Sequence, residues 1–224
     1  MKSGIISSVK MRLVSDESRP RDVVAGIFKG LKLSLNLASQ TQIYLGLWER
    51  ETYPAIEKAA NSATWFVDVG AGAGELCCYF AKRPNVNRIY AIEPQRSELV
   101  LAKQNASLNA IPDGKIDYLQ KRVSPDAADD AIKLDDLALG EGPGFIKIDV
   151  DGFEMEVLRS GPNLLARKNV TLLIETHTVL LEKECISFLQ SMGYSCVIIY
   201  NAWWRSIFPE KRTIEHNRWL SAAR

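Results

Sequence analysis

The sequence has no long apolar run and no excess of charge of one sign. No stretch of about 18 consecutive apolar residues occurs. The N-terminal segment, MKSGIISSVKMRLVSDESRP, interrupts its apolar residues with Ser and Lys before the apolar core of a signal peptide forms. Lysine and arginine number 28 and aspartate and glutamate 27, so no field of one sign attracts nucleic acid or an anionic membrane. We therefore expect neither a nucleic-acid partner nor a membrane span.

Cysteine is scarce, and its spacing predicts no disulfide framework. The residues are Cys77, Cys78, Cys185 and Cys196, and none of them forms a CxxC pair. Because two of the four are adjacent in the chain, they are poorly placed to staple distant segments. We therefore expect reduced thiols and a cytoplasmic location.

The chain is long enough to form one large domain with a short appendage. Its 224 residues are 46% hydrophobic and 25% charged, as in ordinary globular proteins. Residues 1–64 contain helical patterns and no clear strand, so we predict an N-terminal helical cap there. Residues 65–224 are predicted to form the main domain. The sequence leaves open whether the chain forms a homo-oligomer.

From Trp65 onward, short apolar runs alternate with helical segments. The runs are WFVDVG, RIYAIEP, IDYLQKRV, GFIKIDV, VTLLIET and YSCVIIY. This alternation predicts parallel strands joined by helical crossovers, in an α/β, Rossmann-like sheet covered on both faces. Ligands of such sheets bind outside the carboxyl ends of the strands. The polar residues at these ends are Asp68, Glu93, Asp149, Asp151, Glu175 and His177.

The segment FVDVGAGAGE places Gly70, Gly72 and Gly74 between a strand and a helix. Glycines let a ligand approach the backbone, and the helix that follows offers free N–H groups, although a tight turn alone also favours glycine. Two acidic residues make a cofactor site more specific. Asp68 lies inside the strand, where an apolar residue is expected. Glu93 ends the next strand, from which a carboxylate can hydrogen-bond both hydroxyls of a ribose.

Two cofactors are compatible with these residues, a nicotinamide dinucleotide and S-adenosylmethionine. A dinucleotide would place its pyrophosphate beside the loop, where Glu75 would repel it. S-adenosylmethionine has no phosphate, and a carboxylate near the loop can accept its ammonium group. The charges therefore favour S-adenosylmethionine.

Several motifs carry a family resemblance. FVDVGAGAGE and IYAIEP resemble motifs of class I S-adenosylmethionine-dependent methyltransferases. Within that class, LDDL, GFIKIDVDGFEMEVLRSG and VTLLIETH resemble the FkbM family, as do LGLWERET and the terminal HNRW. This chain has Asp151 where the family more often has Glu.

The resemblance implies a seven-stranded sheet whose last hairpin, 194–200 with 217–222, is antiparallel. It also implies methyl transfer to a hydroxyl oxygen of a sugar, a glycan or another small metabolite. In addition, it implies that Glu49 closes over the cofactor from the cap. The remaining cofactor residues that it implies are Asp68, Gly70, Gly72, Gly74 and Glu93.

The segment GFIKIDVDGFE holds three acidic residues, Asp149, Asp151 and Glu154. Side chains alternate along a strand, so Lys147, Asp149 and Asp151 share one face if the strand extends that far. The spacing of Asp151 and Glu154 also fits a helix capping box with Asp151 at the N-cap. A cap has no use for Asp149, which makes Asp149 the strongest candidate for a functional acid.

Glu175 and His177 stand at the end of another predicted strand, in LLIETH. Adjacent parallel strands lie about 4.8 Å apart, so Asp149 and Glu175 can face one cavity. His177 is suited to take a proton near neutral pH, although a purely structural role, as a surface or capping histidine at a strand end, stays open. We predict Asp149, Asp151, Glu175 and His177 as catalytic residues. We predict no metal, because no ligand spacing demands one, although the carboxylates offer oxygen ligands for Mg²⁺.

The segment NAWWRSIF places Trp203 and Trp204 beside Arg205 in the predicted loop of the last hairpin. Aromatic faces beside an arginine suit a sugar or a planar substrate, and they equally suit an interface or a lid.

Two other functions of the chain stay open at this stage. They are a nicotinamide-dependent oxidoreductase and a module that binds S-adenosylmethionine without turnover.

Overall fold

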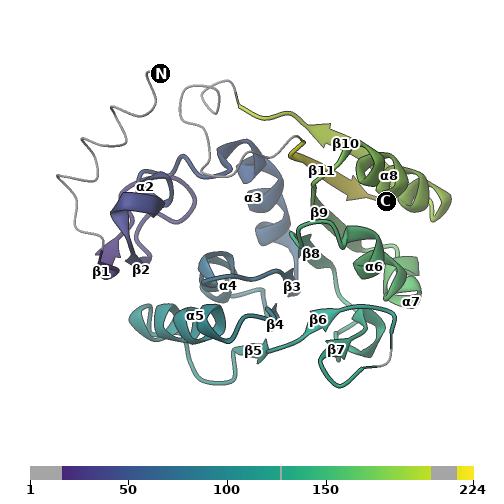
Figure 1. Ribbon diagram of the computed structural model, residues 1–224. Helices are drawn as coiled ribbons and strands as arrows, with labels where there is room; N and C mark the ends of the chain where they lie inside the picture. The colour runs from purple at the N-terminus through teal and green to yellow at the C-terminus, as the bar shows by residue number, and fades with distance from the viewer. Residues whose placement is uncertain (1–16, 127, 203–215) are drawn as a thin grey trace.

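The computed structural model describes residues 17–126, 128–202 and 216–224. Within them, the largest sheet has the strand order β10-β11-β9-β8-β3-β4-β5 (Figure 1). Neighbouring strands pair in parallel from β9 to β5, whereas β11 runs antiparallel to both β9 and β10. This arrangement confirms the predicted α/β, Rossmann-like sheet with an antiparallel last hairpin. The strands are β3 (Trp65–Val69), β4 (Arg88–Ile92), β5 (Ile116–Leu119), β8 (Gly144–Ile148), β9 (Val170–Thr176), β10 (Ser195–Ile199) and β11 (Arg218–Ala223).

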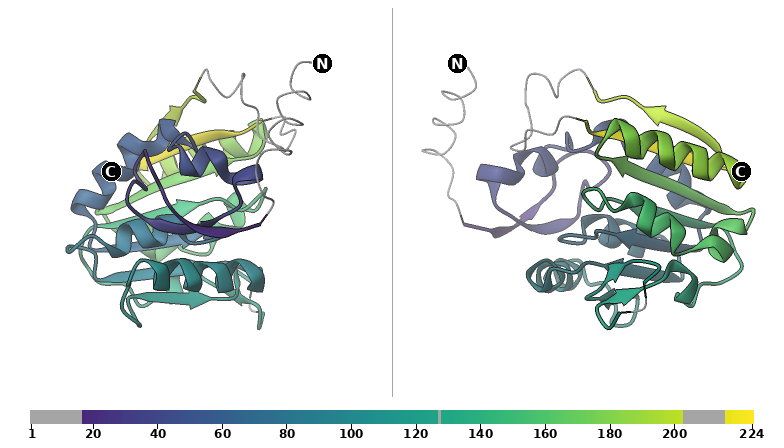
Figure 2. Two further views of the ribbon diagram at one scale, coloured as in Figure 1. Left: turned by 90° about the vertical axis from the view of Figure 1, so that its left-hand side faces the viewer. Right: turned by 45° about the vertical axis from the view of Figure 1, so that its right-hand side comes forward.

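The sheet is buried on both faces, because successive side chains of its strands enter two separate cores. In β3, Phe66 enters a core where its ring stacks on Phe80 at 4.1 Å and on Phe145 at 5.7 Å between centroids. The next residue, Val67, enters the opposite core. Helices α3, α4 and α5 contribute to the first core, and α6, α7 and α8 contribute to the second (Figure 2). The helices are α3 (Tyr53–Ser62), α4 (Glu75–Ala81), α5 (Arg96–Leu108), α6 (Glu154–Arg159), α7 (Pro162–Ala166) and α8 (Val179–Ser191).

The N-terminal segment contains strands, so the prediction that it has none is wrong. Strands β1 (Arg19–Asp22) and β2 (Lys32–Leu35) pair antiparallel. The helical pattern fails there because Gly26 and Gly30 adopt positive φ angles of 75° and 84°, which end any helix between the strands. The segment LKLSL then alternates leucine with polar residues at the period of a strand. Farther along lie α2 (Leu37–Tyr44) and the 3₁₀ turn η1 (Arg50–Thr52).

The last hairpin is antiparallel and lies where the family resemblance places it. Strands β10 and β11 pair from Ser195 opposite Ala223 to Ile199 opposite Trp219. The aromatic pair and the arginine at 203–205 lie outside the described residues. Between β5 and β8 lie the short strands β6 (Arg122–Val123) and β7 (Ala131–Ile132) and the 3₁₀ turn η2 (Leu134–Asp136).

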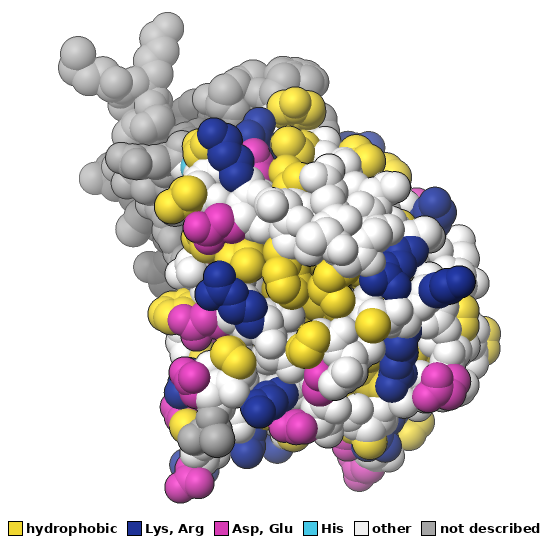
Figure 3. Space-filling model, turned by 90° about the vertical axis from the view of Figure 1, so that its right-hand side faces the viewer, with side chains coloured by type: hydrophobic (Ala, Val, Ile, Leu, Met, Phe, Trp, Pro, Cys, Tyr) yellow, Lys and Arg dark blue, Asp and Glu magenta, His cyan; other side chains and the backbone are white. Residues whose placement is uncertain are grey.

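The described surface is mixed in charge. Figure 3 shows basic and acidic side chains interspersed over the face that it draws. In the part of the chain that the structure describes, no helix has the length and apolarity needed to cross a membrane. The four cysteines are free thiols, as predicted, and all but Cys196 are buried.

Candidate active site

The carboxyl ends of the parallel strands bring the predicted acidic residues to one edge of the sheet. Asp68 lies in β3, and Glu93 directly follows β4. Asp149 directly follows β8, and its backbone N–H donates to the Val69 carbonyl, so the ladder continues to this residue. Glu175 is the penultimate residue of β9. All four strands are neighbours in the sheet, so residues spread over 108 positions of the chain share this edge because of its topology.

The glycine loop, residues 70–74, packs tightly against this edge of the sheet. Gly70 has a φ of +78°, and a Cβ there would lie 1.9 Å from the Asp149 carbonyl oxygen. Any side chain at Gly70 would therefore push β3 away from the segment that carries Asp149. A Cβ at Gly72, in contrast, would meet nothing within 4 Å. The loop thus packs closely on one side and leaves its backbone open at Gly72.

Glu93 is buried against this open part of the loop. Its side chain accepts hydrogen bonds from the backbone N–H groups of Gly72, at 3.1 Å, and Gln95, at 2.9 Å. Each carboxylate oxygen has two lone pairs, so both retain capacity for a further donor. A ribose hydroxyl is one such donor.

Lys147 ties the glycine loop to two carboxylates. Its ammonium group donates to the Gly70 carbonyl at 3.2 Å and to Asp149 Oδ2 at 3.1 Å. It also lies 3.7 Å from Asp68 Oδ1, a buried oxygen that has no hydrogen-bond partner. Burial alone would lower the pKa of Lys147, but Asp149 and Asp68 hold that pKa above its ordinary value. Lys147 is therefore a fixed cation.

Burial shapes the ionisation of the acids beside the loop. It raises the pKa of Asp68 to about 6, against the opposing effect of Lys147. It also raises the pKa of Glu75 to about 7, and the Asp68 charge adds to that rise. Both carboxylates would be more fully ionised if a further positive charge lay close to them.

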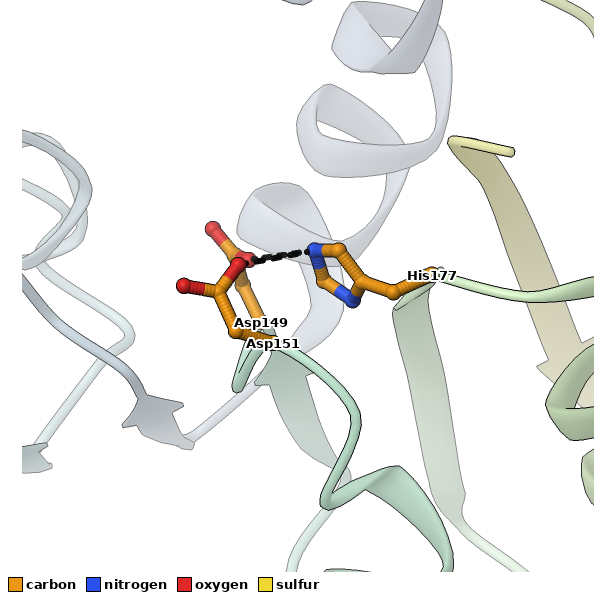
Figure 4. A group of neighbouring side chains, drawn as sticks. All are labelled: Asp149, Asp151 and His177. Carbon is orange, nitrogen blue, oxygen red and sulfur yellow. Dashed lines mark ion pairs between the residues drawn. The ribbon is translucent and has the colours of Figure 1, made fainter. Parts of the chain in front are cut away.

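His177 faces a ring of carboxylates at the end of β9. Its Nδ1 lies 2.5 Å from Glu154 Oε1. Its Nε2 lies 3.2 Å from Asp151 Oδ1, 3.6 Å from Glu175 Oε2 and 3.8 Å from Asp149 Oδ1. Figure 4 shows the imidazole pointing at Asp149 and Asp151. Because Glu154 Oε1 accepts the Gly152 N–H and therefore acts as an acceptor toward Nδ1 as well, Nδ1 carries a proton and Nε2 is the nitrogen that exchanges one.

The acidic residues around His177 shift its pKa, and they also shift the pKa values of one another. Burial alone would lower the pKa of His177, but the Glu154 hydrogen bond and the nearby Asp149 and Asp151 charges raise it above the usual 6.5. Burial alone would raise the pKa of Asp149, but Lys147 and a hydrogen bond from Glu175 lower it. Burial and the Asp149 charge together raise the pKa of Glu175 far above its usual range. Asp149 is therefore ionised and Glu175 is a neutral acid near pH 7.

The capping box predicted for Asp151 and Glu154 does not form. Helix α6 begins at Glu154 and its N-cap residue is Phe153, without a side-chain cap hydrogen bond. Asp151 instead occupies the left-handed region, with φ +41°, and Glu154 is fully buried. Glu154 accepts the Gly152 N–H and contacts His177, so its role differs from the helix architecture that the sequence suggested.

Glu49 reaches the same edge from the N-terminal segment. It has a φ of +46° immediately before η1. Carboxylate oxygens of Glu49, Asp149 and Glu175 all lie within 4.8 Å of one another. The structure thus brings Glu49 to two of the predicted catalytic acids, Asp149 and Glu175.

Two groups of side chains here have the spacing of cation ligands. One is the Glu49 group just described, and the other is Asp149, Asp151 and His177, again with ligand atoms within 4.8 Å. Both groups contain Asp149, so they compete for one residue. The Lys147 ammonium also binds Asp149, at 3.1 Å, and supplies a positive charge beside this shared residue.

Part of the chain is similar to a known protein family. A family model described as the methyltransferase FkbM domain matches residues 127–196. This segment of the chain is similar to the FkbM methyltransferase domain. The match includes the segment from Lys147 to His177, whereas the glycine loop and Glu93 precede it. No functionally curated protein matches the sequence.

Solved structures share the fold of this chain at low identity. An FkbM methyltransferase of Methylobacillus flagellatus has a TM-score of 0.57 and 15% identity, covering 82% of this chain and 65% of that one. An S-adenosylmethionine-dependent O-methyltransferase of Thermotoga maritima has a TM-score of 0.54 and 12% identity, covering 78% and 64%. TrmK of M. capricolum, in complex with S-adenosyl-homocysteine, has a TM-score of 0.51 and 15% identity, covering 75% and 66%. The chain therefore spans less than two thirds of each of these proteins, and it has their class I methyltransferase fold.

Proposed function

We propose that the chain is an S-adenosylmethionine-dependent O-methyltransferase that acts on a hydroxyl of a sugar, a glycan or another small metabolite. The observation that carries the proposal is the position of His177. Its Nε2 faces three carboxyl groups at the sheet edge that also holds the glycine loop. A base at this edge suits the removal of a proton from an acceptor next to the cofactor.

The residues present fit S-adenosylmethionine. The open backbone at Gly72 and the spare lone pairs of Glu93 suit a nucleoside, with Gly70 and Gly74 giving the loop its close packing. The unpartnered Asp68 Oδ1 suits an ammonium group, reached directly or through water. We assign to Glu49, which reaches the same edge from the N-terminal segment, the role of closing over the cofactor. When bound, S-adenosylmethionine supplies a methyl group on a positively charged sulfur.

The charge balance favours this cofactor over a nicotinamide dinucleotide. The edge holds more carboxylates than cations, and burial already raises the pKa values of Asp68 and Glu75 to about 6 and 7. A pyrophosphate would raise those pKa values further, whereas a sulfonium and an ammonium would stabilise the ionised forms. The site is therefore electrostatically matched to a cation.

In the proposed reaction, the chain aligns the hydroxyl and removes its proton. Nε2 of His177 accepts the proton, and Glu154 on Nδ1 keeps the imidazole oriented and stabilises its positive charge. Ionised Asp149, held by Lys147, accepts a hydrogen bond from the hydroxyl and orients it. Neutral Glu175 donates to Asp149 and thereby limits the negative charge at the acceptor. Asp151, on the solvent side, adds to the stabilisation of the imidazolium.

Titration calorimetry tests the cofactor assignment directly. We expect S-adenosylmethionine and S-adenosylhomocysteine to bind the chain, and NADH and NADPH not to bind. Binding of the nicotinamide cofactors alone would replace this proposal with the oxidoreductase. Formation of S-adenosylhomocysteine with a panel of sugars and small hydroxylated metabolites then separates an enzyme from a non-catalytic module.

The pH dependence of the reaction follows from the raised pKa of His177. His177 must be neutral to accept a proton, so kcat/KM is expected to rise with pH and to level off above a pKa higher than 6.5.

The contribution of His177 to the free energy of unfolding is expected to change with pH in the opposite direction. Protonated His177 stabilises the fold below about pH 6.5, and that contribution is lost as pH rises through the raised pKa. Denaturant unfolding of wild type and His177→Gln across this range measures the second effect, and a flat difference between them would contradict it.

Chelation is expected to leave the activity unchanged, because the proposed mechanism uses no metal. Lys147 already supplies a cation to Asp149, and both groups of potential ligands need that residue. The measurement is the rate of S-adenosylhomocysteine formation before and after dialysis against EDTA. Loss of activity that Mg²⁺ restores would instead assign the cation role to one of these two groups.

A further inference from the structure

Asn105 of α5 and Asn109, the C-cap residue of that helix, bind the edge of β2 with the spacing of a strand. Asn105 Oδ1 accepts the Ser34 N–H at 2.8 Å. Asn109, one helical turn farther on, accepts the Lys32 N–H at 3.0 Å and donates to the Lys32 carbonyl at 2.8 Å. Residues two apart in a strand point the same way, and residues four apart in a helix lie on one face, so the two spacings match. Among the described residues, the edge of β2 away from β1 is therefore held by side chains rather than by another strand.

Asn105 differs from Asn109 in one respect, because it also holds the glycine loop. Its Nδ2 donates to the Ala73 carbonyl at 2.9 Å. The same face of α5 presses on the loop through Ala102, whose Cβ would lie 2.8 Å from a Cβ added at Gly74. Asn105 is fully buried, so a lost partner on either side would not be replaced freely by bulk water.

We propose that Asn105 is a positioning residue for the cofactor loop, and that it couples docking of β2 to cofactor binding. The Asn105 side chain hydrogen-bonds both the Ser34 N–H and the Ala73 carbonyl. The loop conformation that would bind the cofactor is therefore also the conformation in which β2 is docked on α5. Coupling of this kind is reciprocal, and cofactor binding must strengthen the docking of β2 by the same factor. The inference rests on the proposed cofactor site at this loop.

The matched pair Asn105→Ala and Asn109→Ala separates coupling from simple docking. Both variants remove contacts to β2, and both are expected to speed amide exchange of residues 32–35. Only Asn105→Ala removes the contact to Ala73. It is expected to raise the Kd for S-adenosylhomocysteine about five- to tenfold, from the loss of hydrogen bonds at a buried site. It is also expected to raise KM for S-adenosylmethionine with kcat retained, whereas Asn109→Ala should change Kd less than twofold.

Hydrogen exchange of the wild-type protein with and without S-adenosylhomocysteine needs no variant. The ligand is expected to slow exchange across β2, and to lose this effect in Asn105→Ala. Equal Kd values for the two variants, or β2 exchange that does not respond to bound ligand in the wild type, would overturn the coupling. If wild type does not bind S-adenosylhomocysteine at all, the proposed function fails instead. Should Asn105→Ala not fold, the wild-type exchange decides alone.

Discussion

Replacement of His177 by Gln is expected to lower kcat by roughly 10² to 10⁴, the range that a positioned general base contributes. Gln fills similar space but cannot take a proton from the acceptor. The Kd for S-adenosylhomocysteine is expected to stay within about threefold, because His177 contacts the acids at the acceptor side and not the glycine loop. The rate of S-adenosylhomocysteine formation, with the panel compound that wild type uses best, measures the change.

Two companion variants make the His177 result specific. His216→Gln removes the other histidine, which contacts Glu182, and is expected to retain activity. Glu154→Gln keeps a hydrogen-bond acceptor for Nδ1 but removes the charge that raises the His177 pKa. It is expected to move the rising limb of kcat/KM to lower pH. A limb that stays in place in Glu154→Gln, or that persists in His177→Gln, would assign the base to another residue.

The second large effect is expected at Asp149. Asp149→Asn keeps the side-chain size but removes the charge that orients the hydroxyl and stabilises the imidazolium, and it leaves Lys147 with the more distant Asp68, at 3.7 Å, as an ion-pair partner. A loss of about 10² in kcat follows, the scale of one lost electrostatic contact to the reacting groups. Lys147 still donates to the Gly70 carbonyl, so cofactor binding is expected to change little.

Asp129→Asn is the matched control for this substitution, since Asp129 is exposed and lies between β6 and β7, outside the strand ends of the large sheet. Turnover and S-adenosylhomocysteine binding are measured for both variants. Unchanged turnover in Asp149→Asn would make this acid a structural partner of Lys147. Loss of cofactor binding together with turnover would place Asp149 on the cofactor side of the site.

The sheet and its strand ends were predictable because they depend on local pattern and on general topology. Alternating apolar runs and helices predict the parallel sheet, and the rule that ligands bind at the carboxyl ends of the strands points to Asp149 and His177. The structure places His177 Nε2 3.8 Å from Asp149 Oδ1. Their roles in the reaction remain predictions.

The contacts of Glu154 were not predictable from spacing. The same D-x-x-E pattern serves a capping box or a turn, and the choice depends on His177, 23 residues away. Lys147 was visible only as part of a charged strand face, because its contact with Gly70 spans 77 residues. The strands at 19–35 were missed because two glycines with positive φ interrupt a run that otherwise has helical spacing.

The measurement that tests the central claim most directly is a crystal structure of the chain with S-adenosylhomocysteine. The account predicts the ribose hydroxyls on Glu93, the nucleoside along the backbone at Gly72, and the sulfur at the edge where Asp149 and His177 meet. A nucleoside bound away from Glu93, or a sulfur directed away from His177, would contradict the account.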